Sequence, residues 1–260
     1  MRTKVAWAGV TLLVLLCVVL AGWRLSGGRW VRVETASMGT QAPVGTLLWV
    51  KPVAFDSLRP GDLVTFRAHG ARYTHLVKTV HADGTLTTQG RISAPDPWRV
   101  GRGDVIGKVV LVWPGAGWVV LAAPVLLGGW LLVWLLVRRL RDPDWRMPAA
   151  VVGSAAVLAL ALVAYRPLTR ADQLSFVSEH GAARATYVST GLVPLRLSAT
   201  GADPVRLRDG EVGSVLARER DGRYAVAVRP DIPFGWWAGL VAVCFLPVIG
   251  RLVRTSRIVR

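Results

Sequence analysis

The stretch VAWAGVTLLVLLCVVLAGW at residues 5–23 decides the fold class of this chain. Its 19 residues carry no charge, and a helix that rises about 1.5 Å per residue crosses a hydrocarbon layer of roughly 30 Å at that length. The run is longer than the roughly 7–15 apolar residues of a cleaved signal peptide, and no clear small-x-small cleavage site ends it. We therefore expect an uncleaved transmembrane anchor at residues 5–23, with a cleaved signal peptide as the alternative.

Three further uncharged runs follow, at residues 115–137, 147–165 and 234–250. The last is the shortest and contains Pro247. Tryptophan prefers the headgroup level of a bilayer, and tryptophans gather near the ends of these runs: Trp23, Trp113, Trp118, Trp134, Trp145, Trp236 and Trp237. The sequence thus predicts a membrane protein with four transmembrane helices.

Composition agrees with a membrane protein. Hydrophobic residues make up 52% of the chain, the mean hydropathy is +0.42, and 32 Lys and Arg against 16 Asp and Glu give a net charge of +16. A composition this apolar, without a long basic run, indicates a lipid bilayer as partner and excludes intrinsic disorder and a nucleic acid. Cys17 and Cys244 both lie in apolar runs, so we expect no disulfide framework and no metal site built on cysteine.

The short basic segments predict the orientation. Ten of the 32 basic residues lie in residues 1–4, 138–146 and 251–260, and short basic loops stay in the cytoplasm. We expect a multi-pass plasma-membrane protein with both termini cytoplasmic and with residues 24–114 and 166–233 outside. Arg24, Arg29 and Arg32, just beyond the first span, oppose this orientation.

Both outer segments have the pattern of β structure. Short β-prone runs alternate with turn signals such as Arg59-Pro60-Gly61-Asp62. The runs lie at residues 47–50, 63–66, 76–80 and 86–88 in the first segment, and at 185–188, 205–207 and 224–228 in the second. We expect a mainly-β catalytic domain at residues 24–114 and a second small β-rich outer domain at 166–233.

The first outer segment contains three residues whose side chains could take part in catalysis. Ser37, His75 and Asp96 each have an ordinary interpretation when taken singly: a loop serine, a satisfied half-buried histidine and an aspartate in a turn. Their order and surroundings change that interpretation. The motifs around them are SMGTQAPVGT at 37–46, LRPGDLVTF at 58–66, THLV at 74–77, TTQG at 87–90, GRISAPDPW at 90–98 and VIGKV at 105–109.

In order and spacing these motifs resemble those of type I signal peptidases, over about residues 5–135. A histidine in the THLV motif is similar to the archaeal and endoplasmic-reticulum Ser-His subfamily, where typical bacterial enzymes have a lysine. The resemblance implies a serine endopeptidase that removes signal peptides from exported preproteins. It also implies small residues before the scissile bond, the protein export machinery as a further partner, and neither a metal nor a cofactor.

The resemblance also implies a role for each site residue. Ser37 is the expected nucleophile and His75 the general base, since neutral imidazole accepts a proton near neutral pH. Asp96 is expected to orient the imidazole and stabilise its cation. The backbone N–H of Ser37 and the side chain of Thr35 are the expected oxyanion donors.

Three departures from the family pattern bear on this hypothesis. The Ser-Met-x-Pro of the relatives becomes Ser-Met-Gly39-Thr40, and their Gly-Asp-Ala-Asn becomes Gly-Arg91-Ile-Ser. Lys78 lies three residues after His75 and is a rival base, but an odd offset on a strand places the two side chains on opposite faces.

Two other classes of protein remain as alternatives. A non-enzymatic membrane scaffold could use a degenerate peptidase domain to bind exported peptides, and the departures at Gly39, Thr40 and Arg91 favour it. A channel or transporter is disfavoured, because the predicted spans contain no ionisable residue in their interior. Since every motif lies before Val110, the sequence also predicts that the second outer segment is dispensable for the chemistry.

Overall fold

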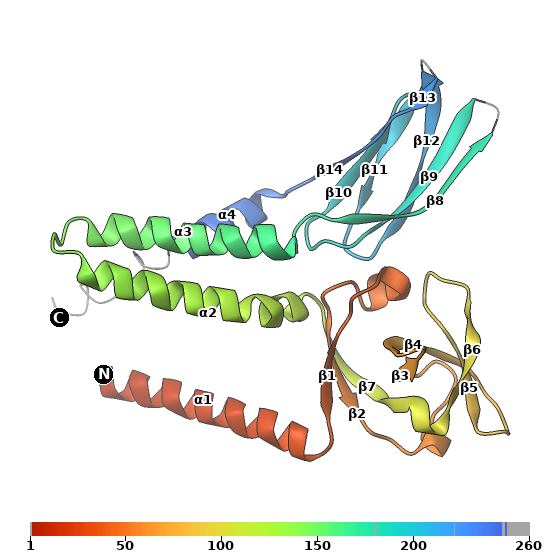
Figure 1. Cartoon of the computed structure of the whole chain (residues 1–260), viewed down its shortest axis with the longest axis horizontal. Coiled ribbons are helices and arrows are strands. Elements are labelled where there is room, and N and C mark those ends of the chain that lie inside the picture. Colours follow the sequence, from red (N-terminus) through yellow and green to blue (C-terminus); the bar gives the residue numbers. More distant parts are fainter. Residues whose placement is uncertain (1, 180, 221, 246–247, 249–260) are drawn as a thin grey trace. The chain divides into compact units, whose positions relative to one another are not determined.

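The computed structural model of the chain describes every residue except 1, 180, 221, 246–247 and 249–260 (Figure 1). The chain divides into two compact units. The first unit consists of Met1–Met38 and Thr46–Pro114, and the second of Gly39–Gly45 and Gly115–Arg260. The short segment Gly39–Gly45 therefore leaves the first unit and belongs to the second.

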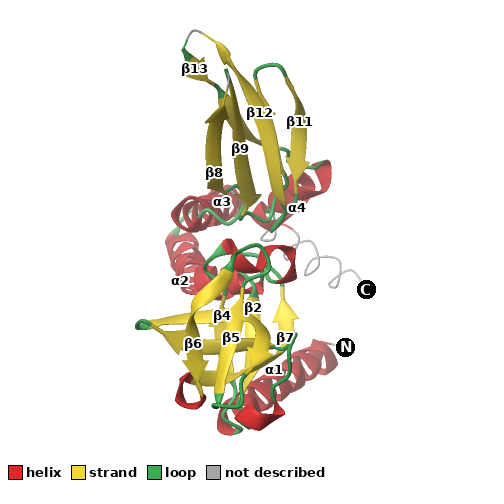
Figure 2. Ribbon diagram, turned by 90° about the vertical axis from the view of Figure 1, so that its right-hand side faces the viewer, coloured by secondary structure: helices red, strands yellow, loops and turns green. Residues whose placement is uncertain are grey.

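The first unit contains one antiparallel sheet of seven strands in the order β1-β2-β7-β3-β4-β5-β6, which curls into a half-barrel (Figures 1 and 2). It follows the helix α1 (Arg2–Leu25). The strands are β1 (Arg29–Arg32), β2 (Leu47–Lys51), β3 (Leu63–Ala68), β4 (Ala71–Val80), β5 (Thr85–Gln89), β6 (Pro95–Gly101) and β7 (Val105–Trp113). The 3-10 helices are η1 (Ala36–Gln41), η2 (Phe55–Ser57) and η3 (Arg102–Asp104).

Alternation along the strands builds the core of this unit. Val64 and Phe66 of β3 point to the same face, because residues two apart on a strand share a face. They pack with Val77 of β4 and Leu86 of β5, and all four are at most 2% exposed. Burying one such side chain contributes about 1.5–3 kcal/mol. The core therefore holds β4, the strand that carries His75, firmly between β3 and β5.

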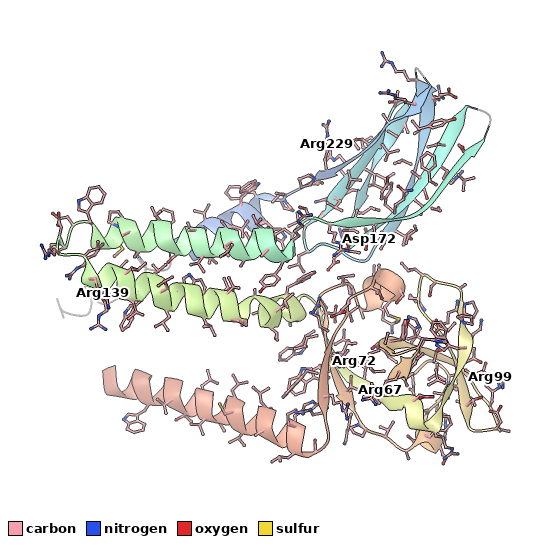
Figure 3. All side chains as sticks on the ribbon, in the orientation of Figure 1. Arg67, Arg72, Arg99, Arg139, Asp172 and Arg229 are labelled. Carbon is pink, nitrogen blue, oxygen red and sulfur yellow. The ribbon has the colours of Figure 1, made fainter. Side chains whose placement is uncertain are left out.

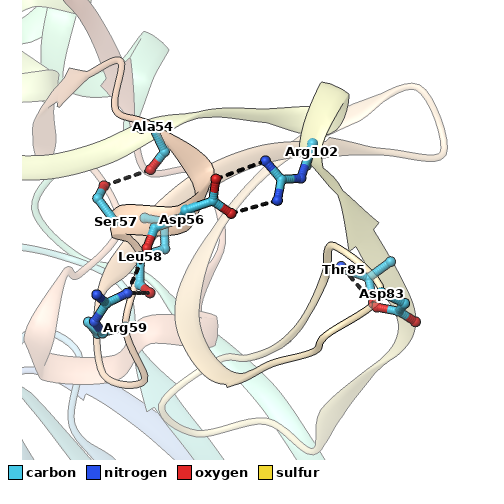
Figure 4. A network of polar contacts seen from close by, with 8 residues as sticks. All are labelled: Ala54, Asp56, Ser57, Leu58, Arg59, Asp83, Thr85 and Arg102. Atoms are coloured by element: carbon cyan, nitrogen blue, oxygen red, sulfur yellow. Dashed lines mark hydrogen bonds and ion pairs between the residues drawn. The ribbon is translucent and has the colours of Figure 1, made fainter.

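Polar contacts fix the connections outside the sheet (Figure 4). Arg102 of η3 donates two hydrogen bonds to the carboxylate of Asp56 in η2, at 3.1 and 2.5 Å. Arg59 donates to the backbone carbonyls of Asp56 and Leu58 at 2.7 and 2.9 Å. Exposed ion pairs contribute about 0–1 kcal/mol, so these contacts orient the loops more than they stabilise the fold.

The second unit contains two helices with the length and apolar composition of membrane spans, α2 (Ala116–Arg139) and α3 (Arg146–Tyr165). They pack through reciprocal pairs of glycine and valine. A Cβ atom on Gly129 would lie 2.7 Å from the Cγ atoms of Val157, and one on Gly153 would lie 2.8 Å from those of Val133. Small residues at these positions let the two backbones approach closely, as is common between membrane helices.

A basic loop joins these two helices. Arg138 and Arg139 close α2, and Figure 3 shows Arg139 at that end of the helix. Arg146 begins α3 and donates to the backbone carbonyl of Leu140 at 3.2 and 2.9 Å. The side chain of Arg146 thus links the start of α3 to Leu140, the residue that follows α2.

The second unit also contains a small β-sandwich, which is followed by the helix α4 (Phe234–Cys244). One sheet has the order β13-β12-β9-β8 and the other β11-β10-β14. Ala185, Leu197, Leu207 and Val215 come from both sheets and form one buried core. The strands are β8 (Ala171–Glu179), β9 (Ala182–Ser189), β10 (Leu195–Ala199), β11 (Ala202–Leu207), β12 (Val212–Arg220), β13 (Arg223–Tyr224) and β14 (Val226–Pro230).

The four predicted spans differ in how well the described helices match them. The runs at 115–137 and 147–165 correspond to α2 and α3, the two described helices that are long and apolar enough to cross a membrane. The run at 5–23 lies within the 24-residue helix α1, of which the segment Gly9–Leu25 counts as a shorter apolar helix and not as a full span. The run at 234–250 begins as α4, and Pro247 lies outside the described residues. The first and fourth spans stay predictions.

Candidate active site

Ser37 lies in the first turn of η1, with its backbone fixed by the loop that follows β5. The backbone carbonyl of Ser37 accepts a hydrogen bond from the N–H of Ile92 at 3.0 Å. Gly90 is so close that a Cβ atom there would lie 2.7 Å from the carbonyl oxygen of Ser37 and 3.0 Å from its Cβ. Only glycine fits at this position, and Ser37 is therefore held from the same loop that leads to Asp96.

His75 lies in the middle of β4, opposite Val64 of β3. It is 5% exposed, and its ring lies against the aromatic rings of Phe66 and Tyr73, with centroid distances of 6.1 and 6.0 Å. A buried imidazole needs partners for both ring nitrogens, because unpaired buried polar groups cost free energy. Both nitrogens of His75 have one.

The three predicted catalytic residues form a continuous chain of hydrogen bonds. Nε2 of His75 is 2.9 Å from Oγ of Ser37, and Nδ1 of His75 is 2.7 Å from Oδ2 of Asp96. A carboxylate only accepts, so Nδ1 carries the proton and Nε2 presents its lone pair to the serine hydroxyl. This is the arrangement in which a serine hydroxyl can be activated as a nucleophile.

Asp96 reaches His75 from β6, the last strand of the sheet. Oδ2 of Asp96 also accepts a hydrogen bond from the hydroxyl of Thr88, at 2.6 Å, and Thr88 on β5 is fully buried. A second donor holds the carboxylate in one orientation. Neither Thr88 nor Gly90 is recognisable as a site residue from the sequence, although both lie in the TTQG motif at 87–90.

Thr35 and Lys78, the remaining predicted participants, occupy different places. The hydroxyl of Thr35 lies 3.4 Å from Oγ of Ser37, so it is at the site. Lys78 is exposed on β4 whereas His75 is buried, as the odd offset between them predicts. Of these two basic residues, His75 is the one that contacts the serine hydroxyl.

The departures from the family pattern have local explanations. Gly39 adopts φ 53° and ψ −136°, a combination that is essentially restricted to glycine. Arg91 is exposed, and Asp96 supplies the acidic group that contacts His75. The triad is therefore complete despite both changes.

A groove of about 530 Å³ opens at Ser37 and His75. It is lined by residues 30–35 on one side and 70–75 on the other, together with Ser37 and Met38. β1 contributes one wall and is one of the two edge strands of the sheet. An edge strand presents unpaired backbone groups to which an extended peptide can bind.

Among the described residues, no group of three or more His, Cys, Asp or Glu side chains could hold a metal ion. Cys17 and Cys244 are free thiols.

No protein-family model matches this chain, and the comparison with curated proteins finds no match. The relation to signal peptidases accordingly remains a resemblance of motifs.

Proposed function

We propose that the chain is a membrane-bound serine endopeptidase that removes signal peptides from exported proteins, with Ser37 as nucleophile and His75 as general base. The observation that carries the proposal is the buried chain of hydrogen bonds from Ser37 through His75 to Asp96. His75 lies on β4 and Asp96 on β6, the two strands that flank β5, so the pairing of β5 with both strands brings the two side chains together.

The reaction divides into two steps of acyl transfer. Oγ of Ser37 attacks the scissile carbonyl carbon while Nε2 of His75 removes the hydroxyl proton. His75 then gives that proton to the leaving amine, and an ester between Ser37 and the signal peptide remains. A water molecule, deprotonated by His75, hydrolyses the ester, and the serine hydroxyl is regenerated. Asp96 stabilises the imidazolium during both steps.

The oxyanion needs donors beside Ser37. In a 3-10 helix the N–H groups of the first turn have no acceptor within the helix, and Ser37 lies in the first turn of η1. The hydroxyl of Thr35, 3.4 Å from Oγ of Ser37, is the second candidate donor. Both can face the same developing charge.

The membrane helices and the groove support this substrate class. A signal peptide is itself an apolar segment that ends at the membrane surface. The helices α2 and α3 suit a protein held in the same bilayer. The groove beside edge strand β1 suits an extended segment next to the scissile bond. We place the catalytic domain on the outer face, following the basic segments of the sequence.

A scaffold without catalysis explains less. It needs a peptide groove but not a histidine hydrogen-bonded to both a serine and a carboxylate. The substitution at Gly39, which favours a scaffold in the sequence, instead fits a backbone conformation that glycine favours. The enzyme is therefore the better supported of the two functions.

The test is cleavage of a preprotein with a small-x-small junction by the purified full-length chain in detergent. Ser37→Ala and His75→Ala should each lower the rate about 10²–10⁴-fold, and the double variant should be little worse, because the two residues act as one unit. Ser57→Ala is the matched control, since Ser57 is an exposed serine of another 3-10 helix, η2.

Two further variants complete the test. Asp96→Asn should be intermediate, and Thr35→Ala should lower turnover by up to about 10²–10³-fold if its hydroxyl is an oxyanion donor. Cleavage by Ser37→Ala at the parent rate would refute the enzyme assignment. Loss of activity in Lys78→Ala with full activity in His75→Ala would reassign the base.

A further inference from the structure

The loop that follows the nucleophile is packed within the second unit. Ser37 and Met38 belong to the first unit, but Gly39–Gly45 belongs to the second. Trp118, near the start of α2, donates its indole N–H to the carbonyl of Val44 at 3.2 Å, and both residues are buried. The segment Gly39–Gly45, which follows Ser37 and Met38, is therefore held by elements that lie outside the catalytic motifs in the sequence.

The closest of these contacts comes from the turn between β11 and β12. A Cβ atom on Gly210 would lie 2.5 Å from the carbonyl oxygen of Gly39, 2.6 Å from its carbonyl carbon and 2.8 Å from Cα of Thr40. All three atoms are backbone, so no side chain can move aside to make room. Gly210 also has φ +77°. Glycine is required here both by its conformation and by the space.

The turn that carries Gly210 is itself rigid. The N–H of Gly210 donates to the carbonyl of Ser189 at 2.9 Å, and the N–H of Ser189 donates to that of Glu211 at 3.0 Å. Within the turn, the N–H of Arg208 donates to Oε2 of Glu211 at 2.8 Å. These bonds tie the turn to the end of β9, so the surface offered to Gly39 is fixed by the sandwich.

The opposing segment has no such stiffness of its own. Gly39 adopts φ 53° and ψ −136°, and glycine has more conformational freedom than any other residue. Thr40 occupies the position where the resembling family has a proline, which would fix φ. The Gly39-Thr40 segment thus takes its conformation from what packs against it.

We propose that the turn at residues 208–211 positions the nucleophile. By clamping Gly39 and Thr40, it fixes the backbone two residues after Ser37, and with it the direction of the Ser37 hydroxyl and N–H. This inference rests on the proposed function, and it makes the second outer domain a working part of the peptidase. Gly210 is a positioning residue, since it touches neither the substrate nor the reacting atoms.

The decisive variant is Gly210→Ala, with Gly181→Ala as its matched control. Gly181 has the same φ of +77°, and apart from its chain neighbours no heavy atom of the described residues lies within 4 Å of a Cβ placed there. Both substitutions therefore impose the same backbone strain, and only the first adds an atom against Gly39. Glu211→Ala is a gentler variant that loosens the turn without adding any atom.

Two measurements on the full-length chain in detergent separate this inference from the proposed function. The first is amide hydrogen exchange over residues 38–45, which needs no activity. Gly210→Ala should accelerate exchange about 10-fold or more relative to Gly181→Ala, and Glu211→Ala should accelerate it to a smaller extent. Equal exchange in Gly210→Ala, Glu211→Ala and Gly181→Ala would overturn the clamp.

The second measurement is the separate determination of kcat and KM for preprotein cleavage. Because a misplacement of about 1 Å can cost about 10²-fold in rate, Gly210→Ala should lower kcat at least about 10-fold, with KM within about two-fold of the parent. Gly181→Ala should change neither value. Faster exchange with an unchanged kcat would leave Ser37 as the nucleophile and refute the positioning role of the turn. A parent protein that does not cleave at all would refute the proposed function and, with it, the positioning role.

Discussion

Thr88 orients the carboxylate of the triad without touching the serine. Its hydroxyl donates to the same oxygen of Asp96 that accepts from His75, and it is fully buried. Thr88→Val keeps the shape and removes the donor, so we expect the carboxylate to be less well fixed and kcat to fall about 10-fold. Thr88→Ser should restore the rate. The measurement is kcat for preprotein cleavage.

The control for this prediction is the neighbouring residue. Thr87 bonds with His81 at 2.7 Å, away from the triad, so Thr87→Val should stay within a few-fold of the parent. If Thr88→Val and Thr87→Val lose activity equally, the effect is one of strand stability and not of the carboxylate's orientation.

Asp209 is a half-buried acid whose pKa makes stability depend on pH. Burial raises its pKa to about 7, although the N–H of Gly210 opposes the shift, and Oδ1 has no hydrogen-bond partner among the described residues. Between pH about 4 and 7 the folded state therefore holds a proton that the unfolded state has lost. Stability from this group is present at low pH and is lost as the pH rises through that range.

We expect Asp209→Asn to remove this dependence. One pKa unit corresponds to about 1.4 kcal/mol, and since the group is partly exposed the gain at pH 8 should be only about 1–2 kcal/mol. Thermal unfolding in detergent at pH 4 and pH 8 measures it. The variant should be more stable than the parent at pH 8 and comparable at pH 4; a gain confined to pH 4 would contradict the assignment.

Much of the site can be predicted from residues in sequence, but its geometry cannot. Ser37, His75 and Asp96 are recognisable because motifs surround them, and the exposure of Lys78 follows from strand alternation. Thr88 and Gly90 are missed because their importance lies in contacts across strands: a hydroxyl that meets Asp96 on β6, and a backbone that approaches Ser37. Such contacts depend on register, which local patterns do not specify.

At the scale of elements, the predicted strands are present but too short and too few. Residues 47–50, 63–66 and 86–88 lie within β2, β3 and β5. β6 is not predicted, since Pro95 and Pro97 argue against a strand. The two prolines are tolerated because β6 is the edge strand opposite β1. The sandwich strands β8, β10 and β12 also lack a run that stands out.

The packing of α2 on α3 depends on single glycines. Gly129 faces Val157 so closely that a Cβ atom would lie 2.7 Å from its methyl groups, whereas no neighbouring atom of the described residues lies within 4 Å of a Cβ on Gly128. Gly129→Leu should destabilise the chain by about 1–3 kcal/mol through overpacking, and Gly128→Leu should not. The two substitutions change helix propensity equally. The midpoint of thermal unfolding in detergent distinguishes them.

An equal loss in both variants would show that the effect comes from the helix itself or from its lipid surface. An effect confined to Gly129→Leu would instead identify the interface between α2 and α3 as the source of stability.

For the whole molecule, aromatic residues and charges indicate how the chain meets the bilayer. Trp23 at the end of α1 lies against Trp49 of β2, with ring centroids 5.0 Å apart, and Trp30 and Trp113 also contact Trp49. Indole rings favour the headgroup level. This cluster would place the junction of α1 and the sheet at the membrane surface, if α1 spans the bilayer as the sequence predicts.

The orientation is testable by accessibility. In a variant with Cys17 and Cys244 replaced by serine, single cysteines at Ser57 and Thr200 should react with an impermeant thiol reagent in intact cells. Cysteines at Asp142, in the basic loop between α2 and α3, and at Thr255 should react only after permeabilisation, because short Arg-rich segments stay in the cytoplasm. Four spans require this alternation. Labelling of position 255 from outside, with position 142 protected, would leave an odd number of crossings after the basic loop and so refute the four-span topology. Labelling of position 142 from outside would invert the orientation. Ser37 would then lie in the cytoplasm, where exported preproteins are not processed.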